Sequence, residues 1–117
     1  MPLSSFEADR VRILHMIDAG KQPLEFARDR SRGDLDSNAM FRRAVVHCLQ
    51  EIGEAAVQIS QDTRAVLPGV PWTQITRMRN RLVHGYFAVN LDLVWDVISN
   101  ELNPLIEDLE RFPDSQK

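Results

Sequence analysis

The stretch from Arg79 to Tyr86 places guanidinium, imidazole and phenol side chains close together in the chain. A guanidinium binds phosphate oxygens through forked hydrogen bonds, and an imidazole gains or loses a proton near neutral pH. Cleavage of RNA without a metal uses such groups: a base removes the 2′-hydroxyl proton, an acid protonates the departing 5′-oxygen, and a cation stabilises charge on the phosphorus oxygens. Arg79 and His84 are therefore candidate catalytic residues.

The spacing of Arg79 and His84 leaves their convergence open. Five residues on a continuous helix correspond to roughly 140° of rotation and about 7.5 Å of rise, so the two side chains do not automatically share one face. His84 precedes Gly85, where we expect the helix to end, and the long side chain of Arg79 can swing toward the same place. One histidine is short of the two that concerted acid and base roles usually need, and a symmetric dimer can supply the second.

Charge is distributed unevenly along the sequence. The segment from Thr63 to Leu91 has no acidic residue and a formal charge of +4, whereas the whole chain has a formal charge of −3. The basic residues of this segment are Arg64, Arg77, Arg79 and Arg81. A local cationic segment attracts a polyanion even when the net charge is unfavourable. We predict that Arg77 and Arg81 bind RNA; the alternative for each is a solvated helix face.

The sequence as a whole resembles the HepT toxins of the HEPN superfamily, small helical ribonucleases that are encoded beside a minimal nucleotidyltransferase. The motif of that family is an Arg followed by four residues, the first of them polar, then His, any residue and Tyr. It is matched without a departure by Arg79, Asn80, His84 and Tyr86. The resemblance covers nearly the whole chain and includes Arg10 to Ile17, Ile52 to Ala55, Pro71-Trp72, Tyr86-Phe87 and Val94-Trp95.

This resemblance implies a metal-independent endoribonuclease that works as a homodimer, with the two motifs facing each other across a cleft. It implies that Arg79 and His84 are catalytic and that Asn80 positions them or the RNA. It also implies a toxin–antitoxin system, in which the cognate MNT-type nucleotidyltransferase is the antitoxin and transfers AMP from ATP to Tyr86. Added phosphate beside the cationic groups would neutralise them and obstruct RNA entry. Tyr86 is then a regulatory acceptor, and the resemblance implies no cofactor.

Two other functions would use the same residues. A noncatalytic HEPN module would bind RNA or a nucleotide through the cationic segment without turnover. A helical interaction subunit would only hold the nucleotidyltransferase. Cleavage of RNA separates the ribonuclease from both alternatives, and RNA binding without cleavage favours the noncatalytic module.

Length and composition fit one helical domain over residues 1–117. The chain has neither an apolar run near the ~20 residues that span a bilayer nor a visible secretory signal, so we expect a cytoplasmic protein without a membrane anchor. The only cysteine, Cys48, lies in an apolar helical pattern, which favours a buried and inert thiol. His47 and Glu51 have helical spacing, but a metal site needs more convergent ligands, and we expect none.

Apolar periodicity predicts an all-α fold, an antiparallel bundle of four to five helices. The first helix should run from about Ser5 to Ala19 and stop at Gly20. Pro23 can then begin a short helical piece.

A long second helix should begin at a cap formed by Asp36 or Ser37 and reach Asp62 or beyond. Gly53 inside it suggests that another backbone comes close there, because glycine costs a helix about 1 kcal/mol relative to alanine. The alternative is that the helix merely tolerates this glycine. The role of Glu54 stays open: it can contact a motif arginine, orient His84, or lie at the surface.

Two further helices complete the bundle. Pro71 suits the first turn of the helix that carries the motif, and Gly85 is its natural stop. The final helix should begin near Asn90 or Asp92, and Pro104 should kink or split it.

Overall fold

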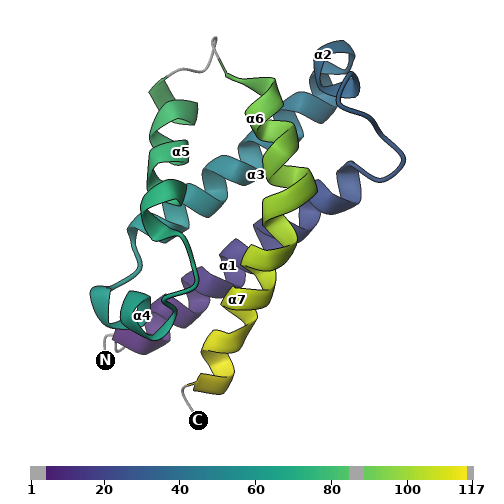
Figure 1. The fold of residues 1–117 in the computed structure, drawn as a ribbon. Coiled ribbons are helices and arrows are strands. Elements are labelled where there is room, and N and C mark those ends of the chain that lie inside the picture. Colours follow the sequence, from purple (N-terminus) through teal and green to yellow (C-terminus); the bar gives the residue numbers. More distant parts are fainter. Residues whose placement is uncertain (1–4, 85–88, 116–117) are drawn as a thin grey trace.

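Four long helical segments dominate the fold (Figure 1). The computed structural model describes residues 5–84 and 89–115, and every regular element within these ranges is helical. The long segments are α1 (Ser5–Phe26), α3 (Ala39–Val57), α5 (Trp72–His84) and the C-terminal run of α6 (Leu91–Asp96), η2 (Val97–Glu101) and α7 (Leu102–Ser115). Two short helices, α2 (Asp34–Ser37) and α4 (Gln61–Val66), lie between them. The predicted all-α bundle is confirmed.

The core lies between α1 and α3 and extends to the two other long segments. α1 packs along α3 on one side and against α7 on another, while α5 packs against α3. Buried apolar side chains from all four segments form one continuous cluster. Its most deeply buried members include Ile13, Met16, Leu35, Leu49, Ile52, Leu102, Leu109 and Phe112. Burial of each such side chain contributes roughly 1.5–3 kcal/mol, so the apolar contacts of α1 with α3 and α7, and of α3 with α5, hold the bundle together.

The first helix is longer than predicted. α1 continues through Gly20 and Pro23 to Phe26, so the expected stop at Gly20 and the separate piece after it were wrong. The reason is tertiary: Gly20 is buried, and a Cβ there would lie 3.2 Å from Cγ1 of Ile106 in α7. Close packing of α7 on this point favours the helix over the break that glycine and proline propensities suggest.

The boundaries of the long second helix also differ from the prediction. Its N-cap is Asn38, whose side chain accepts a hydrogen bond from the backbone N–H of Phe41, instead of Asp36 or Ser37. The helix ends at Val57 and does not reach Asp62. A new cap at Ser60 begins α4, and this cap is held by a residue far away in sequence.

That residue is Asp9 on α1, a carboxylate with only 1% of its surface exposed. It accepts hydrogen bonds from the hydroxyls of Ser60 at 2.5 Å and Thr63 at 2.6 Å. Nη1 of Arg12, on the next turn of α1, lies 3.7 Å from Oδ1 of Asp9. Buried carboxylates are tolerated when several donors satisfy them, and here these donors fasten the start of α4 to α1.

The start of the C-terminal segment agrees with the prediction. Asn90 caps α6 by accepting hydrogen bonds from the backbone N–H groups of Asp92 and Leu93. Before Pro104 the helix passes through one π-helical turn, in which the N–H of Leu102 bonds to the carbonyl of Val97. Proline disturbs the regular hydrogen-bond ladder in the turn before it, and the π turn keeps the segment helical there.

The structure also bears on Cys48 and on membrane-spanning helices. Cys48 is buried, as expected, and burial raises the pKa of its thiol to about 11, which keeps it protonated at neutral pH. None of the helices in the described ranges has the length and apolar character needed to cross a membrane.

Replacement of Asp9 by alanine should lower the free energy of unfolding by roughly 2–4 kcal/mol, because it leaves the buried hydroxyl of Thr63 and the Ser60 cap without their acceptor. Urea denaturation followed by circular dichroism measures this loss. The control is Asp18→Ala, which removes an exposed carboxylate on the same helix and should change stability by less than about 0.5 kcal/mol. Equal stability of the two variants would contradict a structural role for the Asp9 network.

Candidate active site

The motif helix α5 lies directly against α3 at Gly53. A Cβ built on Gly53 would overlap the Cβ of Arg79 and lie 2.6 Å from its Cγ and 3.3 Å from its Cα. No larger residue fits at this point without moving α5. The expected close approach of another backbone to Gly53 is confirmed, and the partner is the motif arginine itself.

Arg79 is held on two edges of its guanidinium. Its Nε donates to Oε1 of Glu54 at 2.9 Å, and its Nη1 donates to Oδ1 of the adjacent Asn80 at 3.0 Å. The side chain of Arg79 is 27% exposed and that of Glu54 is 50% exposed. The structure thus answers the question about Glu54: it contacts a motif arginine.

Further contacts fix α5 along α3 and at its start. The side-chain amide of Gln50, one turn before Glu54, donates to the backbone carbonyl of Leu82 at 3.3 Å. At the other end, Trp72 is buried and its indole N–H donates to the carbonyl of Leu67. The helix begins at Trp72, directly after Pro71, whereas the prediction placed Pro71 in its first turn. Gln50 was not singled out from the sequence, although its four-residue spacing to Glu54 places both on one face of α3.

Arg77 and Arg81 lie on a different face of α5 from Arg79. Residues four apart share a helix face, whereas residue 79 is rotated by roughly 160–200° from both. Arg77 and Arg81 line a cleft of about 500 Å³ between α5 and the C-terminal segment. Arg79 instead turns to α3. The structure therefore brings Arg79 and Asn80 together, and it separates Arg79 from Arg77 and Arg81.

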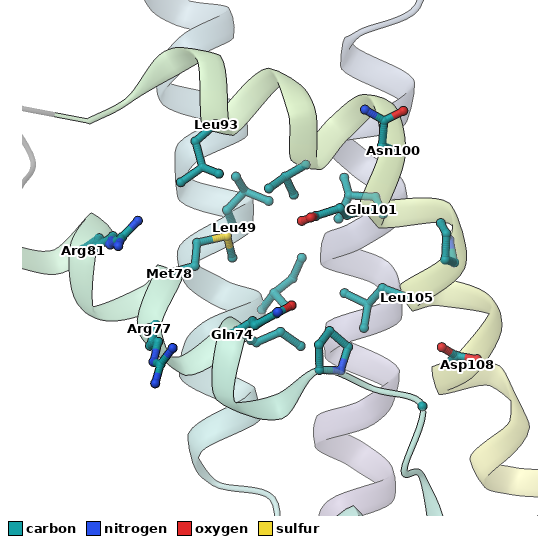
Figure 2. A pocket seen from close by; sticks show the side chains of 17 residues that line it. Leu49, Gln74, Arg77, Met78, Arg81, Leu93, Asn100, Glu101, Leu105 and Asp108 are labelled. Carbon is teal, nitrogen blue, oxygen red and sulfur yellow. The ribbon is translucent and has the colours of Figure 1, made fainter.

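The cleft has an apolar floor and walls of opposite charge (Figure 2). Met78 and Gln74 reach into it from α5, and Glu101 and Leu105 reach into it from the other side. Asp108 also lines the wall that faces the arginines. Arg77 and Arg81 thus line one wall of the cleft, and Glu101 and Asp108 line the other.

The fourth arginine of the cationic segment is used for packing. Arg64 donates from Nη2 to the carbonyl of Ala56 at 2.9 Å, and its guanidinium lies over the ring of Trp72, 5.3 Å from the centroid. The four basic residues that are close in sequence therefore occupy three separate environments.

The remaining motif residues are only partly covered by the structure. His84 is the last residue of α5, but its side chain lies outside the described part of the molecule. Tyr86 and the predicted helix stop Gly85 lie outside the described residues as well. The roles of His84 and Tyr86 therefore stay predictions.

A polar surface depression that includes Glu54 lies between α1 and α3. Its lining residues are Arg12, His15, Asp18, His47, Gln50, Glu51, Glu54, Ala55 and Gln58. In it Nε2 of His47 lies 3.4 Å from Oε1 of Glu51. Within the described ranges, no group of three or more His, Cys, Asp or Glu side chains is arranged to hold a metal ion.

Sequence comparison agrees with the class of protein that the helical fold and the motif indicate. Residues 16–112, from α1 to α7, match the family described as Ribonuclease HepT-like. The chain therefore belongs to the HepT-like ribonuclease family.

Several curated proteins are similar to this chain over most of their length. “Putative RNase MJ0125” of Methanocaldococcus jannaschii is 32% identical over 117 aligned residues, which cover 94% of this chain and 98% of that protein. “Putative RNase TTE0752” of Caldanaerobacter subterraneus is 32% identical over 100 residues, covering 82% and 89% of the two chains. “Probable ribonuclease HepT” of Thermococcus cleftensis is 31% identical over 88 residues, covering 75% and 80%. No solved structure matches the chain.

Replacement of Gly53 by alanine should destabilise the protein by about 1–3 kcal/mol, because the added methyl group forces α5 away from α3. This loss exceeds the gain of about 1 kcal/mol that alanine brings to an open helix position. Thermal and urea denaturation measure it. The control is Gly33→Ala at an exposed site, where the nearest atom to an added Cβ is Oγ of Ser31 at 3.9 Å. A more stable Gly53→Ala protein would contradict the close approach.

Proposed function

We propose that this protein is a metal-independent endoribonuclease and the toxin of a toxin–antitoxin pair, acting in the cytoplasm as a homodimer of single-domain chains. Its membership in the HepT-like ribonuclease family supports the reaction class. The observation that carries the assignment to particular residues is the hydrogen-bonded guanidinium of Arg79, which lies on α5 and is the first residue of the sequence motif Arg79, Asn80, His84 and Tyr86. An arginine held by a carboxylate and an amide is pre-organised to bind a phosphate group.

In the proposed reaction the ribose 2′-oxygen attacks the adjacent phosphorus. The bond from phosphorus to the 5′-oxygen breaks, leaving a 2′,3′-cyclic phosphate on one fragment and a 5′-hydroxyl on the other. His84 transfers protons in this reaction, and Arg79 stabilises the negative charge that develops on the phosphorus oxygens. Asn80 supports the reaction by bonding to the guanidinium of Arg79.

A homodimer would complete the proton transfers. One base must take the proton of the 2′-hydroxyl and one acid must give a proton to the 5′-oxygen. A single motif contains only one histidine, so we infer that His84 of a second copy takes the other role across a two-fold axis.

Arg77 and Arg81 are proposed to bind RNA outside the reacting phosphate. They share a face of α5 and line the cleft beside it, so their charges can attract the chain on either side of the cleaved bond. Because Glu101 and Asp108 line the opposite wall, the RNA backbone would follow the α5 side of this cleft.

Regulation is proposed to act on Tyr86, two residues beyond His84. The cognate MNT-type nucleotidyltransferase would transfer AMP from ATP to the phenol oxygen and release pyrophosphate. The added phosphate would place negative charge beside the motif and obstruct RNA.

Arg79→Ala and His84→Ala should each abolish cleavage of RNA by the purified protein, because each removes a group that acts in the transition state. Gel analysis of labelled RNA measures cleavage, and circular dichroism checks the fold. The matched controls are Arg28→Ala and His47→Ala, which remove exposed side chains of the same types away from the motif. RNA binding with no cleavage by the unsubstituted protein would instead favour a noncatalytic module.

Tyr86→Phe should leave cleavage intact and make the protein resistant to the nucleotidyltransferase, because the acceptor oxygen is lost. Intact-protein mass spectrometry after incubation with the partner enzyme and ATP should detect one or more adenylyl groups on the parent protein and none on the variant. Equal modification of both proteins would contradict the assignment of Tyr86.

A further inference from the structure

The contact between Glu54 and Arg79 joins two helices that are far apart in the sequence. Glu54 lies on α3 directly after the glycine that admits α5, and its Oε1 accepts the Nε–H of Arg79 at 2.9 Å. Nη1 of Arg79 also donates to Asn80, so these two hydrogen bonds together use two of the five N–H donors of the Arg79 guanidinium. Among the described residues the other donors have no hydrogen-bond partner, so they can bind a phosphate.

We propose that Glu54 is the positioning residue for Arg79, fixing the orientation in which its guanidinium meets the phosphate that is cleaved. This inference rests on the proposed ribonuclease function. Arginine has a long side chain with many rotamers, and holding it in one of them before the substrate binds removes an entropic cost from the reaction. A displacement of about 1 Å in a positioned group can reduce turnover by about 100-fold.

Folding stability does not explain this contact. Half of the Glu54 side chain and about a quarter of the Arg79 side chain are exposed to solvent. Ion pairs that are exposed to this degree contribute little to stability because water and salt screen them. The close fit of α5 on α3 is provided by Gly53, which carries no charge.

Charge repulsion alone predicts that Glu54 weakens the binding of RNA. A carboxylate next to a phosphate site repels the substrate, so removal of Glu54 should strengthen RNA binding if charge were its only contribution. Positioning predicts a loss of turnover instead. The two explanations therefore differ in the kinetic parameter that changes: KM falls in the first, and kcat falls in the second.

The test compares Glu54→Ala and Glu54→Gln with Glu51→Ala. Glu51 is an exposed carboxylate one turn earlier on α3, where it pairs with His47, so its removal changes the net charge equally without touching Arg79. We expect kcat for cleavage of a fluorescent oligoribonucleotide to fall at least tenfold in Glu54→Ala and to remain unchanged in Glu51→Ala. Glu54→Gln should recover part of the loss, because its amide oxygen can still accept the Nε–H of Arg79.

A second measurement does not depend on cleavage. The Nε–H signal of Arg79 in a ¹⁵N-correlated NMR spectrum is identified by its disappearance in Arg79→Lys. It should lie away from the position of solvated arginines in the parent protein and in Glu51→Ala, and it should move to that position in Glu54→Ala.

Each outcome decides between the proposals. A signal that is unchanged in Glu54→Ala, or turnover equal to that of the parent, would overturn the role of Glu54. A parent protein that does not cleave RNA would contradict the proposed function, and the NMR comparison would then decide alone whether Glu54 orients Arg79.

Discussion

The contact of α5 with α3 at Gly53 is the constraint on which the candidate site depends. Because the glycine has no side chain, the backbone of Arg79 can lie directly against α3. The next residue along α3, Glu54, is then within hydrogen-bond distance of the guanidinium. α3 itself is fixed by its apolar stripe against α1, and Asp9 fastens the segment after it. The packing of α3 against α1 thus determines the position of Arg79.

The helical class and several helix ends could be predicted because their signals are local. Asn90 supplies a side-chain acceptor where α6 begins, and Pro71 precedes α5. The errors occurred where distant residues decide the outcome. Gly20 and Pro23 suggest a break, but packing of Ile106 on this part of α1 accompanies a continuous helix. Likewise, α3 ends at Val57, shortly before Ser60, whose hydroxyl donates a hydrogen bond to Asp9, about fifty residues earlier in the sequence.

The candidate site could be predicted as a set of residue types but not as an arrangement. The motif identified Arg79 and Asn80, which do contact each other, and Gly53 indicated a close backbone approach. The run of arginines also indicated a local cationic segment. Helix geometry separates Arg77 and Arg81 from Arg79, because alternate residues point to opposite sides of a helix. The pairing of Glu54 with Arg79 needed the packing of two helices, which sequence spacing does not contain.

The central claim is that RNA is cleaved by attack of its own 2′-hydroxyl group, with protein side chains performing the catalysis. The most direct measurement is the chemical identity of the fragment ends formed by the purified protein in excess chelator. The account predicts fragments with 2′,3′-cyclic phosphate and 5′-hydroxyl ends. Fragments with 3′-hydroxyl and 5′-phosphate ends, or cleavage that appears only when a divalent metal is added, would contradict it.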